Sequence, residues 1–185
     1  MFRFVLFSLL LLVFQNENFS FELPGKYSTY FTWSANRKLT WNDFKENYKV
    51  SKYSVEAAKV STSITYGCSV SNNEISYIVE ARLYPKASWS NKEAQFDYVL
   101  QHEQLHFDIT ELFARKLRKI LSEKIKNHKD YKLVNKYGDK ISDDWDVFQD
   151  KYDRETDHGT NDSKQKEWNI AIQQQLKMLE DFASK

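Results

Sequence analysis

The sequence predicts an α+β domain in which an antiparallel sheet packs against one long helix and a further helix closes the chain. Three observations lead to this prediction. Residues 26–85 are rich in aromatic and β-branched residues in alternating apolar stretches, whereas residues 90–183 carry apolar residues at helical spacing. Aromatic residues make up 16% of the 185 residues, with only 4 Gly and 2 Pro, which is typical of a folded chain with a sizeable core.

Residues 1–19 have the layout of a secretory signal peptide. Arg3 supplies a positive start, residues 4–14 are almost purely apolar, and a polar stretch follows. The apolar run is too short to span a bilayer comfortably, and no small-x-small triplet marks a cleavage site, so an uncleaved anchor is the alternative. We expect a secreted or periplasmic protein, with a single domain over residues 20–185 and no stable membrane insertion apart from the leader.

The first half of the domain contains the expected strands. They are Tyr27–Trp33, Val55–Tyr66 and Ile75–Tyr84, with a hairpin turn at Ser69–Asn73. Leu39–Phe44 is expected to be a strand end that runs into a helical turn. Because Ile75–Tyr84 precedes the long helix, we expect it to be a sheet edge to which a substrate peptide adds as an extra strand.

The second half is expected to be helical. Ser90 and Glu93 form the pattern of a capping box and predict a helix from about Asn91 to Lys126. Residues 131–157 predict only short helices and loops. A second helix is expected to start near Asp162 and to end at about residue 182. Its apolar face is formed by Trp168, Ile172, Leu176 and Leu179.

The charge balance and the cysteine content argue against several classes of function. The 27 Lys and Arg residues balance 26 Asp and Glu residues, so nothing indicates a nucleic-acid partner or a polyanionic substrate. The one cysteine, Cys68, excludes an internal disulfide and a cysteine-based zinc site. It lies in an apolar stretch and is expected to be a small buried residue.

The pattern His102-Glu103-x-x-His106 falls inside the long predicted helix. Histidines four residues apart differ by about 40° around a helix and about 6 Å along it, so both imidazoles can bind one zinc ion. The glutamate of this pattern can take a proton from the zinc-activated water. The alternative is a solvated helix face, because five-residue matches also arise by chance.

A catalytic zinc site needs a third protein ligand, and helix geometry argues against the nearby carboxylates. Asp108 lies about 200° from His106 around the helix, and Glu111 about 140°. A Gly and a His at the third and sixth positions after His106 would supply a nearby ligand, but Ile109 and Leu112 occupy these positions. The third ligand is therefore expected from a later segment.

His158 is the predicted third ligand. It precedes the last predicted helix, and Gly159 lets the backbone turn tightly beside a ligand. Glu155 is the alternative third ligand, since a carboxylate from a later segment also completes such sites. For both Glu155 and Asp153 the other interpretation is a helix-end or loop charge. His128 follows a lysine-rich helix end and is expected to be exposed.

Several segments together resemble the DUF922 family, bacterial proteins described as predicted secreted zinc-dependent proteases. The resemblance covers nearly all of the chain after the leader and rests on Trp33 with Arg37–Phe44, Ser88-Trp89, His102–Glu111 with Ala114-Arg115, Thr156-x-His158-Gly159, and Gln165-x-x-Trp168. It implies a zincin-like peptidase with His102 and His106 as zinc ligands and Glu103 as the general base.

The predicted function is that of a secreted zinc metallopeptidase, which takes Zn²⁺ as its cofactor and hydrolyses peptides or proteins with a zinc-activated water. Two alternatives stay open. One is a non-catalytic zinc-containing binding module, which a fourth side-chain ligand would favour. The other is a zinc amidase that acts on cell-wall peptides.

Residues near the motif carry further predictions. Tyr152 is a candidate oxyanion donor, with a role in packing as the alternative. Asp108, Glu111 and Arg115 are expected to form a buried polar network. The aromatic core is expected to include Trp33, Trp41 and Trp89, with the lining of a cleft as the alternative.

Overall fold

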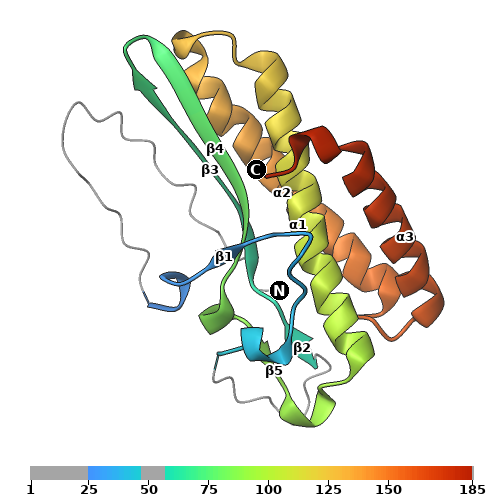
Figure 1. Cartoon of the computed structure of the whole chain (residues 1–185). Coiled ribbons are helices and arrows are strands. Elements are labelled where there is room, and N and C mark those ends of the chain that lie inside the picture. Colours follow the sequence, from blue (N-terminus) through green and yellow to red (C-terminus); the bar gives the residue numbers. More distant parts are fainter. Residues whose placement is uncertain (1–24, 47–56, 185) are drawn as a thin grey trace.

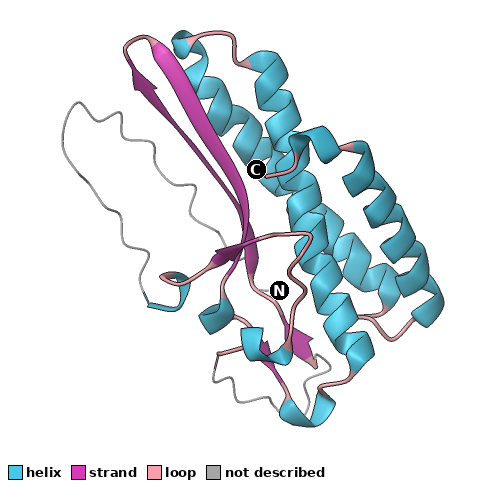
Figure 2. Cartoon of the chain, in the orientation of Figure 1, coloured by secondary structure: helices cyan, strands magenta, loops and turns pink. Residues whose placement is uncertain are grey.

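Strands come first along the chain and three long helices follow, so the predicted α+β class is confirmed (Figures 1 and 2). The computed structural model describes residues 25–46 and 57–184. The predicted leader, residues 1–19, lies outside the described residues.

The main sheet is antiparallel and has the strand order β1-β4-β3. β3 (Thr62–Ser71) and β4 (Glu74–Leu83) form a long hairpin that projects along one side of the helices (Figure 1). Asn72 and Asn73 make its turn with φ of 51° and 61°, a left-handed conformation that asparagine tolerates and that suits the twist of a hairpin. The hairpin turn predicted in this region is therefore confirmed.

The expectation that Ile75–Tyr84 forms a sheet edge beside the site is wrong. β4 is the middle strand, because it pairs with β3 along its length and with β1 (Phe31–Thr32) at its C-terminal end. The strand predicted to end at Tyr66 is divided in two. Its first part, β2 (Ala58–Lys59), pairs with β5 (Trp89–Ser90) in a separate small sheet.

The helix α1 (Asp97–Lys124) lies at the centre of the fold and packs against β3, β4 and the two later helices (Figure 1). Its N-terminus differs from the prediction. The side chain of Asn91, not Ser90, accepts a hydrogen bond from the backbone N–H of Glu93 and caps a short 3₁₀ turn before α1. Burial on several faces is consistent with this central position; the buried apolar residues of α1 are Val99, Leu105, Phe107, Ile109, Leu112, Phe113, Ala114, Leu117 and Leu121.

The prediction of short helices and loops over residues 131–157 is wrong, because this segment forms one helix, α2 (Tyr131–Thr156). Its buried residues form a narrow stripe: Val134, Gly138, Ile141, Tyr152 and Thr156. Charged residues occupy many of the other positions. The helix is therefore stabilised mainly by packing this stripe against α1 and β3 rather than by its local sequence.

Gly138 lets α2 lie close to β3. A Cβ atom at this position would overlap the ring of Tyr66, which lies on β3. The Tyr66 hydroxyl also donates a 2.6 Å hydrogen bond to Asp139 Oδ1. Glycine inside a helix costs about 1 kcal/mol relative to alanine, and the close approach of the two elements gives a packing reason for it here.

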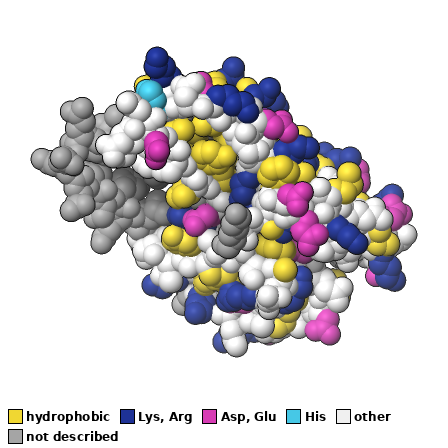
Figure 3. Space-filling model, turned by 45° about the horizontal axis from the view of Figure 1, so that its top comes forward, with side chains coloured by type: hydrophobic (Ala, Val, Ile, Leu, Met, Phe, Trp, Pro, Cys, Tyr) yellow, Lys and Arg dark blue, Asp and Glu magenta, His cyan; other side chains and the backbone are white. Residues whose placement is uncertain are grey.

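The closing helix α3 (Asp162–Met178) confirms the prediction of a helix start near Asp162. Asn161 caps it by accepting a hydrogen bond from the backbone N–H of Lys164. None of the helices in the described residues is long and apolar enough to cross a membrane. On the face shown in Figure 3, basic and acidic side chains are interspersed among hydrophobic ones.

Candidate metal centre

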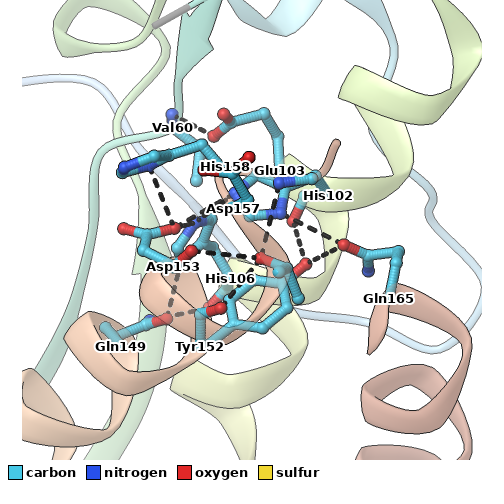
Figure 4. Close-up of polar contacts among 12 residues, drawn as sticks. Val60, His102, Glu103, His106, Gln149, Tyr152, Asp153, Asp157, His158 and Gln165 are labelled. Carbon is cyan, nitrogen blue, oxygen red and sulfur yellow. Dashed lines mark hydrogen bonds and ion pairs between the residues drawn. The ribbon is translucent and has the colours of Figure 1, made fainter. Parts of the chain in front are cut away.

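Two histidines of α1 and one carboxylate of α2 meet in a compact cluster (Figure 4). His102 and His106 lie one helical turn apart, and their Nε2 atoms are 3.1 Å from each other. Asp153 Oδ1 lies 3.1 Å from His102 Nε2 and 2.9 Å from His106 Nε2. Three potential metal-ligand atoms from two helices therefore face a common point.

Two glutamines orient the imidazole rings from the outside. The Nδ1 atom of His102 lies 3.2 Å from Gln165 Oε1, and that of His106 lies 2.7 Å from Gln149 Oε1. Both Nδ1 atoms must donate, because these amide oxygens only accept hydrogen bonds. Each Nε2 atom then carries a lone pair directed into the cluster, which is the arrangement that metal-binding histidines usually show.

The amide orientation of each glutamine follows from its other bonds. Gln149 Nε2 donates to the backbone oxygen of His106 at 3.0 Å, and Gln165 Nε2 donates to Asn169 Oδ1 at 2.9 Å. The Gln149 amide cannot be reversed without losing its bond to a backbone carbonyl, which supports the tautomer of His106, whereas the orientation of Gln165 depends on those of Asn169 and the Tyr152 hydroxyl.

Electrostatics favour a cation at this point. Burial by itself would lower the pKa of His106, but the hydrogen bond to Asp153 and its charge outweigh burial and raise the pKa to about 9. Burial would raise the pKa of Asp153, but hydrogen bonds with His102 and His106 hold that pKa well below its usual range. The cluster therefore attracts positive charge, either a shared proton or a metal ion.

The donor set fits zinc. Tetrahedral zinc with bonds of about 2.0–2.1 Å places its ligand atoms roughly 3.3 Å apart, close to the observed 2.9–3.1 Å. Two imidazoles and one carboxylate are also a combination that zinc accepts, and three protein ligands leave a position for water or substrate.

Glu103 lies beside the cluster on α1 and is almost completely buried. Its Oε2 atom accepts a 2.6 Å hydrogen bond from the backbone N–H of Val60, which connects β2 to β3 (Figure 4). This bond links the orientation of the carboxylate to the sheet.

The turn between α2 and α3 packs directly against the first histidine. A Cβ atom on Gly159 would lie 2.9 Å from both Cβ and Cγ of His102, and its φ of +85° also favours glycine. Asp157 and His158 before it adopt left-handed conformations with φ of 49° and 50°, each of which costs roughly 1–2 kcal/mol. The turn is thus specialised for close contact with His102.

The third member of the cluster is Asp153, for which the sequence indicated only a helix-end or loop charge. That interpretation does not hold, because the Asp153 carboxylate points inward between the two imidazoles. The predicted third ligand, His158, lies next to the cluster but outside the group of ligand atoms, and its Nδ1 atom is 3.9 Å from Asp153 Oδ1. The alternative, Glu155, lies elsewhere and accepts a 2.9 Å hydrogen bond from Trp168 Nε1.

Tyr152 serves packing rather than oxyanion binding. Its ring stacks on His102 with centroids 4.7 Å apart, and its side chain is fully buried. The hydroxyl lies 2.8 Å from Gln165 Oε1 and 3.2 Å from the backbone oxygen of His102, so it is directed away from the cluster. Burial also raises the pKa of Tyr152. The expectation of an oxyanion donor here is wrong.

The polar network predicted on α1 divides into two parts. Asp108 accepts hydrogen bonds from Trp33 Nε1 and Gln173 Nε2 and so joins the N-terminal segment to α3. Glu111 and Arg115 form a separate ion pair at 2.9 Å. Trp33 and Trp89 are buried as expected, whereas Trp41 is only half-buried; Cys68 is half-buried against the core. His128, expected to be exposed, is partly exposed and contacts the backbone oxygen of Asn73.

Sequence reasoning missed Asp153, Gln149 and Gln165 as members of this site. One signal was available: Gln149 and Asp153 are four residues apart, which places both on one face of a helix. That signal could not be used without recognising that residues 131–156 form a single helix.

Comparison with known protein families shows which family the chain belongs to. A family model described as "Bacterial protein of unknown function (DUF922)" matches residues 20–159, which include His102, Glu103, His106 and Asp153. Searches of curated proteins and of solved structures gave no match. Because the matched range is more than half of the chain, the protein belongs to the DUF922 family.

Proposed function

We propose that this member of the DUF922 family is a zinc-dependent metallopeptidase that hydrolyses amide bonds in peptides or proteins. One observation carries the proposal. The two histidines of a His-Glu-x-x-His pattern direct their Nε2 atoms toward Asp153 of another helix, with distances of 2.9–3.1 Å among the three atoms. His102, His106 and Asp153 would hold the zinc.

When bound, zinc lowers the pKa of a coordinated water to about 7 and polarises a carbonyl group. Glu103 would act as the general base, taking a proton from the attacking water and passing it to the leaving nitrogen. The hydrogen bond from the Val60 N–H holds one oxygen of this carboxylate in a fixed place. Gln149 and Gln165 would keep both imidazoles in the tautomer that leaves Nε2 free for the metal.

The test is cleavage of a mixed peptide library that includes cell-wall peptides, with the zinc content recorded for each protein. The Glu103→Gln variant should hold zinc and lose cleavage, while Glu123→Gln, at an exposed position of the same helix, should behave as the wild type. Equal cleavage by Glu103→Gln, or a wild type without zinc, would reject the proposal. Cleavage of the cell-wall peptides alone would identify an amidase.

A non-catalytic zinc module is the second candidate, favoured by one observation. The imidazole of His158 lies close to the cluster, with Nδ1 3.9 Å from Asp153 Oδ1, and a fourth protein ligand would close the metal site. Zinc bound by both wild type and Glu103→Gln without any cleavage would support this candidate. Export through the leader, residues 1–19, stays a prediction, which fractionation of the producing cells would test.

A further inference from the structure

We propose that an open pocket on the other side of α1 from the metal centre binds a small aliphatic primary amine. The pocket has a volume of about 450 Å³ and lies between α1, α3 and the segment around Leu39 (Figure 1). Asp108 lines it and lies about 200° from His106 around α1. The pocket is therefore separate from the metal centre, and binding there requires neither zinc nor the proposed function.

The size and the lining of this pocket suit a short aliphatic chain with one polar end. Ligand pockets in proteins typically have volumes of about 300–1,000 Å³, mostly apolar walls and a few polar groups. Leu39, Leu100 and Leu105 supply apolar surface here. The backbone N–H of Leu39 donates to Gln104 Oε1 at 2.8 Å, and this bond fixes the N-terminal segment as one wall.

Asp108 is the group that specifies a cation. The residue is only 2% exposed and lines the pocket, yet within residues 25–46 and 57–184 its carboxylate belongs to no ion pair. Three neutral donors hold it instead: Trp33 Nε1 at 2.7 Å, Gln104 Nε2 at 2.8 Å and Gln173 Nε2 at 3.0 Å. Because a buried charge without a counter-ion is costly, a cation bound beside Asp108 would offset part of that cost.

The acceptor sites of Asp108 distinguish an ammonium group from other organic cations. Oδ1 accepts two hydrogen bonds, from Trp33 and Gln104, whereas Oδ2 accepts one, from Gln173. A carboxylate oxygen offers about two lone-pair sites, so one site on Oδ2 is open. A guanidinium group binds best through both oxygens, and a quaternary ammonium has no N–H to donate. A primary ammonium needs only Oδ2, and the side-chain amides of Asn169 and Gln173 on the same pocket wall supply acceptors for its other N–H groups.

Two exposed residues that line the pocket, Lys38 and Asp97, make the charge argument testable. The positive charge of Lys38 opposes a second cation nearby, so Lys38→Gln should strengthen amine binding about twofold to threefold. Asp97 carries the same charge as Asp108, but solvent screens it, so Asp97→Asn should change the affinity less than about twofold. Asp108→Asn should weaken binding at least about tenfold, because it removes the charge from a buried hydrogen bond.

The Asp108→Asn variant should keep the fold. Its side-chain oxygen can still accept from Trp33 and Gln104, and the amide of Gln173 can turn so that its oxygen accepts from the new N–H. Thermal unfolding of each variant checks this. Lys38→Gln, at an exposed position, keeps the proposal testable if the Asp108 variant loses stability.

The experiment is an NMR titration of the metal-free, isotope-labelled protein with n-butylammonium chloride at pH 7. Tetramethylammonium chloride keeps the ionic strength constant and supplies a cation without an N–H group. The side-chain amide signals of Gln104, Asn169 and Gln173 report on the pocket. We expect saturable shifts with a Kd on the order of 1 mM. Binding of n-butanol, which has the same chain without a charge, should be at least about tenfold weaker.

Three results would overturn the proposal. Shifts that do not saturate in the wild type would show that the pocket binds no amine. The same shifts with potassium chloride in place of the amine would assign the pocket to an inorganic cation. Equal weakening by Asp97→Asn and Asp108→Asn, or weaker binding by Lys38→Gln, would show that the buried carboxylate does not select the ligand. None of these results depends on zinc or on peptide cleavage, so failure of the proposed function leaves this proposal standing.

Discussion

Replacement of Gly159 by alanine should damage the metal centre through packing as well as through backbone strain. The added Cβ would lie 2.9 Å from Cβ and Cγ of His102, closer than carbon atoms normally approach. A left-handed alanine costs roughly 1–2 kcal/mol. Overpacking a close contact costs about 1–3 kcal/mol more. Gly159→Ala should therefore lower the free energy of unfolding by about 2–5 kcal/mol.

Gly25 offers the matched control. It also has a positive φ, +63°, but a Cβ there would meet no atom within 4 Å. Gly25→Ala should therefore show the backbone part alone, about 1–2 kcal/mol. Urea unfolding of both metal-free variants gives the two free energies, and their difference isolates the contact with His102.

The contact between Gly159 and His102 should also affect the affinity for zinc. In Gly159→Ala the imidazole of His102 is displaced from its hydrogen bond with Gln165 and from the other ligand atoms, so zinc affinity should fall about 10–100-fold. In Gly25→Ala the zinc affinity should stay unchanged. Chelator competition measures both. If the two variants lose equal stability and bind zinc equally well, the idea that Gly159 positions His102 is refuted.

Three further predictions concern the zinc ligands and their surroundings. Asp153→Asn should lower zinc affinity by at least about 100-fold in chelator competition, because it removes the only carboxylate of the described cluster, while Glu155→Gln should leave it unchanged. Gln149→Leu should weaken zinc binding about 10-fold, since it frees Nδ1 of His106 from its acceptor; an unchanged affinity would show that the tautomer is set in another way. Zinc must displace a proton from His106, whose pKa is raised to about 9 by Asp153, so the apparent affinity should rise about tenfold per pH unit up to pH 9 and then level off. Calorimetry at pH 7 in buffers of different ionisation enthalpy should show the release of about one proton, and no release would contradict the pKa shift.

Local patterns in the sequence were sufficient for the strand-then-helix order and for one half of the site. The spacing of His102 and His106 places both imidazoles on one turn of α1, because a helix is a local structure whose geometry depends on few neighbours. The hairpin turn at Asn72-Asn73 and the start of α3 near Asp162 could be predicted for the same reason, since short-range turn and capping bonds specify them.

Only the tertiary structure decided which residues complete the cluster. Asp153 and Gln149 belong to α2, a helix whose narrow apolar stripe is stabilised by contacts with α1 and β3 and gives a weak local signal. Gln165 comes from a third helix and meets His102 across 63 residues of sequence. The choice of Asp153 over Glu155 depends on how α2 is rotated against α1, because a difference of two positions along a helix turns a side chain by about 200°. That rotation is set by packing between elements distant in the sequence, which no local pattern encodes.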